Sequence, residues 1–300
     1  MTPQPVSETV GEPLRVYTNI LNISDKKLAV LGAGKLGGIL LRAYLKQGLF
    51  VAKRVTATVK HGEEAAALAK ELGVAVTNDN RKAVRGADII LLSVKPQTVT
   101  ELLQEIAPEI SAKTLLVSVA ASVPTSYLEQ QLGAARGGEA NKLAVVRAMP
   151  NTPAAVGCGM TAICRGAHAG PADVEIARTM FNAVGRTVVV DEKNMDAVTG
   201  LSASGPAFAY IILESLAEAG VKVGLPRDVA TLLAAQTMKG AASVVLETGD
   251  HPALLKDAVT TPAGCTIDGI LELEDGKLRV TLIKAVVKAT SRAGELLFEK

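Results

Sequence analysis

Short apolar runs alternate with stretches of helical periodicity along the first two thirds of the chain. The apolar runs have the length of buried strands and cover residues 27–31, 54–59, 74–76, 89–94, 115–119, 143–149, 160–163 and 187–190. Helical periodicity predicts helices over residues 35–47, 63–72, 97–105, 126–132 and 171–184. Such alternation is typical of a mostly parallel sheet with helices on both faces, so we predict an α/β, Rossmann-like, doubly wound domain.

The pattern changes near residue 192, and no convincing strand follows it. Helices are predicted over residues 197–219, 226–246 (with Pro226 as first residue) and 282–296. Small residues over 200–207 allow helix backbones to approach closely, either within one chain or between two. We predict an extension over 1–26, a dinucleotide-binding domain over 27–192 and an all-α substrate and dimerisation domain over 193–300.

Composition narrows the class of protein. The net charge is +2 without basic blocks and aromatic residues make up 3%, which disfavours a nucleic-acid partner. No apolar run reaches the roughly 18 residues of a membrane span, and the first residues lack the pattern of a signal peptide. The 3 cysteines are sparse and not spaced as metal ligands, so we expect a cytoplasmic protein without a metal or membrane.

A glycine-rich turn, Gly32-Ala33-Gly34-Lys35-Leu36-Gly37, follows the first predicted strand and begins a helix. In that context GxGxxG indicates a dinucleotide site, with Gly32 for the tight turn, Gly34 for the approach of pyrophosphate and Gly37 for helix–strand packing. The alternative is an ordinary glycine-rich turn.

The ends of later strands extend this prediction. No acid ends the second strand, where NAD sites usually carry one, and Lys60 stands there instead, so we favour NADPH over NADH. Lys60 as a solvated loop residue is the alternative. Ligands of such sheets bind at the carboxyl ends of the strands. The remaining predicted cofactor residues are Asn80, Ser93, Val94, Lys95, Pro96, Ala121 and Asn151.

A second candidate site precedes a predicted helix, in the stretch Val259-Thr260-Thr261-Pro262-Ala263-Gly264-Cys265-Thr266-Ile267. A helix N-terminus attracts anions, the glycine permits close approach, and threonines add donors. A carboxylate or phosphate pocket is one interpretation, and a plain helix start with a threonine N-cap is the other.

Taken in order, these motifs resemble the pyrroline-5-carboxylate reductase family over residues 27–298. The resemblance is carried by the glycine turn, Val94-Lys95-Pro96 and the segments 149–153, 201–207, 220–226 and 260–266. The chain departs from the family where Ala203 and Ala263 replace common glycines, and where Gly249 stands at the place of a glutamate found in some members.

The resemblance implies hydride transfer from NAD(P)H to the C5=N bond of 1-pyrroline-5-carboxylate, which gives L-proline, the last step of proline synthesis. It implies that the ring carboxylate binds at Thr260, Thr261, Gly264, Cys265 and Thr266, and that the Thr266 hydroxyl lies near the ring nitrogen as an orienting or proton-delivering group. It also implies an obligate dimer, in which the loop of one chain serves the cofactor domain of another, or a ring of such dimers.

Two other functions stay open at this point. One is another imine or β-hydroxyacid reductase, which would use a lysine on the helical domain as acid; Lys222 and Lys239 are not in that setting. The other is a dinucleotide-binding regulatory module without turnover.

Overall fold

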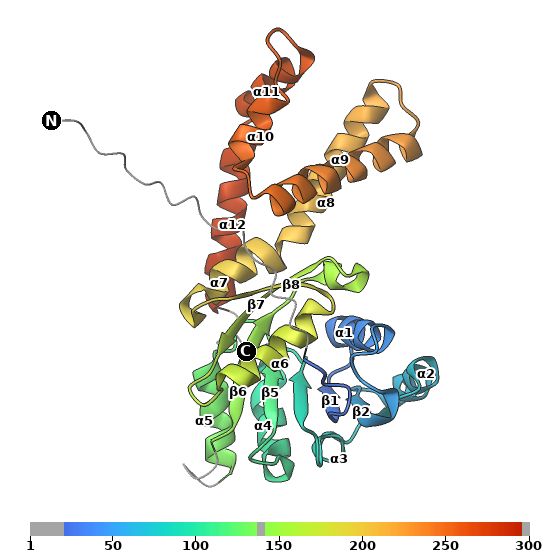
Figure 1. The fold of residues 1–300 in the computed structure, drawn as a ribbon, viewed down its shortest axis with the longest axis vertical. Helices are drawn as coiled ribbons and strands as arrows, with labels where there is room; N and C mark the ends of the chain where they lie inside the picture. The colour runs from blue at the N-terminus through green and yellow to red at the C-terminus, as the bar shows by residue number, and fades with distance from the viewer. Residues whose placement is uncertain (1–20, 137–141, 296–300) are drawn as a thin grey trace, which may run out of the picture. The chain divides into compact units, whose positions relative to one another are not determined.

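The computed structural model describes residues 21–136 and 142–295. It contains an 8-stranded sheet in the order β3-β2-β1-β4-β5-β6-β7-β8, parallel except for the antiparallel pair β6–β7 (Figure 1). The strands are β1 (Leu28–Leu31), β2 (Val55–Thr58), β3 (Ala75–Thr77), β4 (Ile89–Leu92), β5 (Leu115–Ser118), β6 (Ala144–Met149), β7 (Gly159–Arg165) and β8 (Gly185–Val189). The predicted α/β class with a mostly parallel sheet is confirmed.

Helices cover both faces of this sheet. They are α1 (Lys35–Lys46), α2 (Gly62–Leu72), α3 (Asn80–Val84), α4 (Val99–Ile106), α5 (Thr125–Ala135) and α6 (Pro171–Asn182), with short 3₁₀ turns η1 (Ala52–Arg54), η2 (Pro96–Thr98), η3 (Ala107–Glu109), η4 (Thr152–Val156) and η5 (Glu192–Asn194). Leu28 and Val30 join the apolar layer with α1, α2 and α6, while Ala29 and Leu31 join the layer with α3, α4 and α5. A strand sandwiched in this way is apolar at every position, which explains why β1 has no polar alternation.

The region after β8 is helical, but the single helix predicted over 197–219 is wrong. The chain forms α7 (Met195–Val198), a π-helical turn (Thr199–Ala203) and then α8 (Gly205–Lys222). In the turn, the Ser204 N–H donates to the carbonyl of Thr199, five residues back. The turn packs closely on α12 (Leu278–Glu295), because a Cβ on Gly200 would lie 2.2 Å from the Thr290 hydroxyl.

The remaining helices follow the predicted pattern with two differences. They are α9 (Arg227–Thr248), α10 (Pro252–Ala258) and α11 (Cys265–Asp275). Pro226 is the N-cap of α9 and not its first residue. Helices α3 and α10 were not predicted, because five and seven residues are too short to establish a period.

The chain divides into two compact units, each packed mainly within itself. Among the described residues, one comprises 21–136, 142–206 and 283–295 and is called the sheet unit; the other comprises 207–282 and is called the helical unit. These units do not coincide with the predicted domains, and the domain boundaries at residues 26 and 192 stay predictions.

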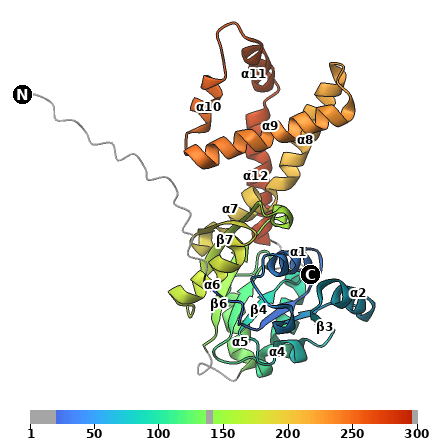
Figure 2. The ribbon, with the colours of Figure 1, turned by 45° about the vertical axis from the view of Figure 1, so that its right-hand side comes forward.

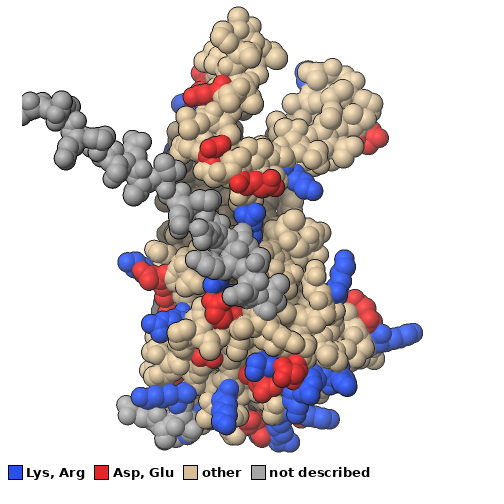
Figure 3. All heavy atoms as spheres, viewed as in Figure 1, with Lys and Arg blue, Asp and Glu red and all other residues tan. Residues whose placement is uncertain are grey.

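The helical unit contains a tight hairpin of α8 and α9, in which a Cβ on Gly220 would lie 2.8 Å from that of Ala230 (Figure 2). Arg227 and Glu218 form an ion pair at 2.5 Å across the same hairpin. Helix α9 is long and apolar enough to span a membrane by length and composition alone, and 11% of its most apolar window is buried. Charged side chains crowd over the sheet unit in Figure 3, whereas the visible face of the helical unit is mostly uncharged.

Candidate functional site

The glycine-rich turn joins β1 to α1 and is held by the end of the neighbouring strand. The Gly32 N–H donates to the Thr58 hydroxyl at 3.1 Å, and the Ala33 N–H donates to the Thr58 carbonyl at 2.7 Å. Gly32 has φ +86, and a Cβ there would lie 2.6 Å from the carbonyl oxygen of Ser93. Thr58 ends β2, at the position where many NAD sites have an acid. Its hydroxyl instead accepts a hydrogen bond from the glycine-rich turn.

The other two glycines of the motif differ in their surroundings. A Cβ on Gly37 would lie 2.3 Å from the carbonyl oxygen of Gly32, so helix and strand can pack only if this side chain is absent. A Cβ on Gly34 would meet nothing within 4 Å. Gly34 is also the exposed N-cap of α1, and no side chain caps that helix end. Its first amides are thus available to an anion.

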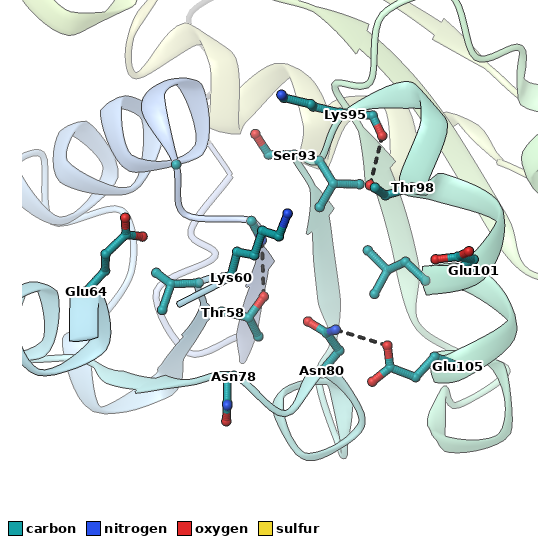
Figure 4. Close-up of a pocket in the computed structure, with 15 residues that line it drawn as sticks. Thr58, Lys60, Glu64, Asn78, Asn80, Ser93, Lys95, Thr98, Glu101 and Glu105 are labelled. Carbon is teal, nitrogen blue, oxygen red and sulfur yellow. Dashed lines mark hydrogen bonds between the residues drawn. The ribbon is translucent and has the colours of Figure 1, made fainter. Parts of the chain in front are cut away.

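A cavity of about 530 Å³ lies beside this turn, within the usual range for small-molecule sites (Figure 4). Seven of the predicted cofactor residues line it together: Gly32, Gly34, Lys60, Asn80, Ser93, Val94 and Lys95. They come from the turns after β1, β2, β3 and β4, which the strand order places next to one another at one edge of the sheet. Such a crevice at the carboxyl ends of strands is where open α/β sheets bind ligands.

Sequence reasoning missed several residues of this cavity: Thr58, Val59, Glu64, Asn78, Thr98, Glu101, Leu102 and Glu105. Glu105 accepts a hydrogen bond from Asn80 Nδ2 at 3.0 Å, and Thr98 donates its hydroxyl to the Lys95 carbonyl at 3.0 Å (Figure 4). Glu101 and Glu105 lie one turn apart on α4, opposite its buried face, and this spacing is a signal that could have placed them together.

Other predicted cofactor residues do not line this cavity. Ala33, Lys35, Leu36, Gly37 and Pro96 belong to the same turns but are not among its lining residues. Ala121 and Asn151, after β5 and β6, lie elsewhere in the sheet unit. Ala121 packs against a small apolar cluster of Met149, Ala162, Cys164 and Met195.

Asn151 connects two segments that are distant in sequence. Its Nδ2 donates to the Ser202 carbonyl at 3.2 Å, and its Oδ1 accepts from the Met160 N–H at 2.9 Å. The asparagine therefore attaches the π-helical turn to the loop after β6, which gives it a structural part whatever else it binds.

The threonine-rich loop lies in the helical unit and leads into α11. Gly264, and not a threonine, is the N-cap of α11, and no side chain caps this helix end. The Gly264 N–H donates to the Thr261 carbonyl at 3.1 Å, while the Thr260 hydroxyl donates to the Lys256 carbonyl at 2.7 Å. Ala263 has φ +58, a left-handed conformation that favours glycine.

The start of α11 is open to solvent. Cys265 and Thr266 are exposed. They are the first two residues of the helix, so their amides have no intrahelical acceptor.

Among residues 21–136 and 142–295, no three His, Cys, Asp or Glu side chains gather as a metal site would require. Burial, with a smaller effect of Glu192, raises the pKa of the Cys164 thiol to about 12, so it stays protonated at neutral pH.

Two protein families match separate parts of the chain. Residues 27–122 match the family described as NADP oxidoreductase coenzyme F420-dependent, and residues 192–296 match the family described as pyrroline-5-carboxylate reductase dimerisation. The glycine turn and its cavity fall in the first match, and the threonine-rich loop falls in the second.

Whole proteins resemble the chain over nearly its full length. The pyrroline-5-carboxylate reductase of Methanosarcina acetivorans is 41% identical over 274 residues, which are 91% of this chain and 99% of the relative. The crystal structure of the Plasmodium falciparum enzyme with NADP bound has a TM-score of 0.81 at 28% identity and covers 91% of this chain and 99% of that one. The enzyme of Coxiella burnetii has a TM-score of 0.80 at 32% identity and covers 90% and 98%.

Proposed function

Because this chain belongs to the pyrroline-5-carboxylate reductase family, it is an oxidoreductase that reduces 1-pyrroline-5-carboxylate to L-proline with NAD(P)H, and we propose which of its residues perform that reaction. The observation that carries the proposal is the open helix start at Gly34, where a side chain would find empty space beside the cavity. A pyrophosphate needs such an approach to backbone amides.

The glycine turn binds the pyrophosphate of the cofactor. Ala33, Lys35 and Leu36 present backbone there, and the positive end of the α1 dipole favours the anion. Lys60, exposed at the end of β2, supplies a cation for the 2′-phosphate and so favours NADPH over NADH. The turns that contain Asn80 and Ser93–Pro96 contact the rest of the nucleotide. When bound, NAD(P)H supplies the hydride for the C=N bond.

Ala121 and Asn151 lie at the nicotinamide end in this proposal. Strands β5 and β6 follow β4 across the sheet, so the turns after them continue the row of strand ends that begins at the glycine turn.

The loop 260–266 binds the carboxylate of the substrate. Gly264 at the N-cap leaves the amides of Cys265 and Thr266 accessible, and the helix dipole favours a negative charge there. Since the Thr260 hydroxyl already donates to Lys256, the hydroxyls of Thr261 and Thr266 are the donors left for the substrate, and Thr260 contributes backbone.

Thr266 then lies beside the ring nitrogen, where its hydroxyl orients the imine or delivers a proton. A cyclic imine can be protonated in water, and the resulting iminium accepts hydride readily. The protein therefore has to align two reactants, which contributes about 7–11 kcal/mol in well-oriented systems, and needs neither a metal nor a triad.

We further propose that the helical domain dimerises with a second copy, that the loop of one chain serves the cofactor domain of its partner, and that dimers assemble into a ring. The exposed apolar side chains of the helical unit support a partner subunit, as does the match to a dimerisation family. The same partner would cover α9, so we propose that the protein binds no membrane. Its net charge of +2 without basic blocks supports the absence of a nucleic-acid partner, and we propose a cytoplasmic location.

One assay tests the activity against the two other functions. Protein is mixed with NADPH and 1-pyrroline-5-carboxylate, and the absorbance of the reduced cofactor is followed; we expect it to fall as proline forms. A constant signal with retained NADPH binding would favour a regulatory module, and turnover of a β-hydroxyacid instead would favour the other reductase class.

A further inference from the structure

Among the described residues, Arg147 is the one charged side chain that is buried, with 3% of its surface exposed. It lies near the end of β6, paired in register with Ser118 on β5 and with Cys164 on β7. A buried cation is costly unless it is paired and hydrogen-bonded, so its partners indicate what it is retained for.

Those partners belong to the segment that follows the sheet. Arg147 Nη1 donates to Glu192 Oε1 at 3.3 Å, and Arg147 Nη2 lies 3.9 Å from Asp196 Oδ1. Arg147 Nε and Nη2 have no hydrogen-bond partner among the described residues, so the guanidinium is not optimised as a salt bridge. The position of the guanidinium is therefore better explained by the segments that it holds in place than by a gain in stability.

Glu192 extends the connection to a third segment. Its carboxylate accepts the backbone N–H of Thr125 at 2.7 Å and the Thr125 hydroxyl at 2.5 Å. Thr125 is the first residue of α5, so the carboxylate caps the positive end of that helix. Thr125 ends the turn that leaves β5, which is the turn that contains Ala121.

Arg147 thus lies between two turns proposed to contact the nicotinamide. The turn with Ala121 is attached to it through Glu192 and Thr125, and the turn with Asn151 follows it directly along β6. Asn151 in turn fixes Ser202 of the π-helical turn.

We propose that Arg147 and Glu192 are positioning residues for hydride transfer, which hold the turns after β5 and β6 at a fixed separation. The proposal rests on the assignment of Ala121 and Asn151 to the nicotinamide end. The pyrophosphate site at Gly34 is separate from this pair, so disturbing the pair should misalign the reacting end of the cofactor while the nucleotide still binds.

The test compares wild type with Arg147→Met, Glu192→Gln and the double variant, at a temperature well below every melting midpoint. We expect kcat to fall roughly 10- to 100-fold in all three, because small misplacements far from the chemistry have effects of that size. The NADPH dissociation constant, from fluorescence titration without substrate, should change less than about threefold. The double variant should recover most of the melting temperature lost in the singles, since no unpaired buried charge remains, but not kcat.

A milder variant, Thr125→Val with Thr125→Ser as its matched control, keeps the proposal testable if the Arg147 or Glu192 variants do not fold. It removes one bond to Glu192 and leaves the ion pair, so a smaller fall in kcat with unchanged NADPH affinity is expected, and none for Thr125→Ser. Recovery of kcat along with stability in the double variant, an equal loss of NADPH affinity, or full activity of Thr125→Val would each overturn the positioning role. Failure of the wild type to oxidise NADPH would instead contradict the proposed function.

Discussion

The two compact units of this chain bury their apolar side chains very differently. The sheet unit encloses two layers of large aliphatic residues, among them Leu40, Leu91 and Leu103, which are fully buried. In the described part of the helical unit, the buried apolar residues are Ala217, Ala230 and Ala234. Large apolar side chains there are exposed instead, for example Leu232 at 69%.

The contrast shows that a sequence can specify helices without specifying a core for them. Helices α8 and α9 approach each other through small residues at Gly220 and Ala230, which leaves little apolar surface covered between them. Exposed apolar patches of this kind mark interaction sites in soluble proteins. The sheet unit has its core within one chain, whereas we propose that the helical unit gains its core from a second copy.

The largest effect is expected from a charge on the uncovered face. Leu232→Glu would bury an unpaired carboxylate in the proposed interface, and this is costly enough to prevent association. We expect the mass of a single chain, 31.0 kDa, in analytical ultracentrifugation and loss of activity. Val51→Asp, at a partly exposed apolar position of the sheet unit (43%), is the matched control and should leave the mass unchanged. Equal masses for both variants would indicate that the helical unit needs no partner.

The next effect distinguishes the glycine that the fold requires from the glycine that cofactor binding requires. Gly37→Val places a side chain against the Gly32 carbonyl and should destabilise the sheet unit by at least about 2 kcal/mol. Gly34→Val has space for its side chain and should lose no more than about 1 kcal/mol, the usual cost of a poor N-cap, yet should abolish NADPH binding. Thermal denaturation and fluorescence titration distinguish the two. Retained NADPH affinity in Gly34→Val would contradict the site.

A smaller effect is expected in the loop of the helical unit. Thr266→Ala removes a hydrogen bond to a charged substrate and should lower kcat/KM for 1-pyrroline-5-carboxylate about 10- to 100-fold, with unchanged NADPH affinity. Thr260→Ala is the control, since that hydroxyl already donates to Lys256. Steady-state kinetics of both variants would reveal the difference, and equal effects would remove Thr266 from its assigned role.

The smallest effect concerns the turn after β5. Ser122 is a buried residue with φ +63, and its hydroxyl donates to the Ala293 carbonyl of α12 within the sheet unit. Ser122→Gly relieves the strain but loses the bond, so its stability should change little. Ser122→Ala loses the bond and keeps the strain, and should unfold about 1 kcal/mol more easily. Denaturant midpoints check the order; if alanine were the more stable, the strain argument would be wrong.

Periodicity predicted the elements whose pattern is set locally. Every strand of the sheet was predicted to within a few residues. The clearest cases are β1 and β4, which are buried at every position and are therefore continuous apolar runs. The break in the helix at the π-helical turn was not predicted. Gly200 of this turn packs against Thr290, which lies 90 positions further along the chain, and local periodicity contains no sign of such a contact. Short helices such as α3 lack enough residues to show a period.

The residues of the candidate site likewise divide into those that local sequence patterns predicted and those that they did not. The glycine turn and Lys60 were found because a motif and a strand end mark them, and the structure brings them to one cavity. Glu101 and Glu105 were missed, since only the packing of α4 beside the glycine turn gives these ordinary surface residues a place in that cavity. The family resemblance supplied what neither pattern nor geometry contains, namely the substrate of the threonine-rich loop.

Subunit mixing tests most directly whether the helical unit completes its site with another chain. Gly34→Val subunits and Thr266→Ala subunits, each with little or no activity alone, are denatured together, refolded and assayed with NADPH and 1-pyrroline-5-carboxylate. If loop and cofactor domain come from different chains, each mixed dimer has one intact site of two, and about a quarter of the wild-type activity should return at equal mixing. Activity no higher than that of the separate variants would contradict the account.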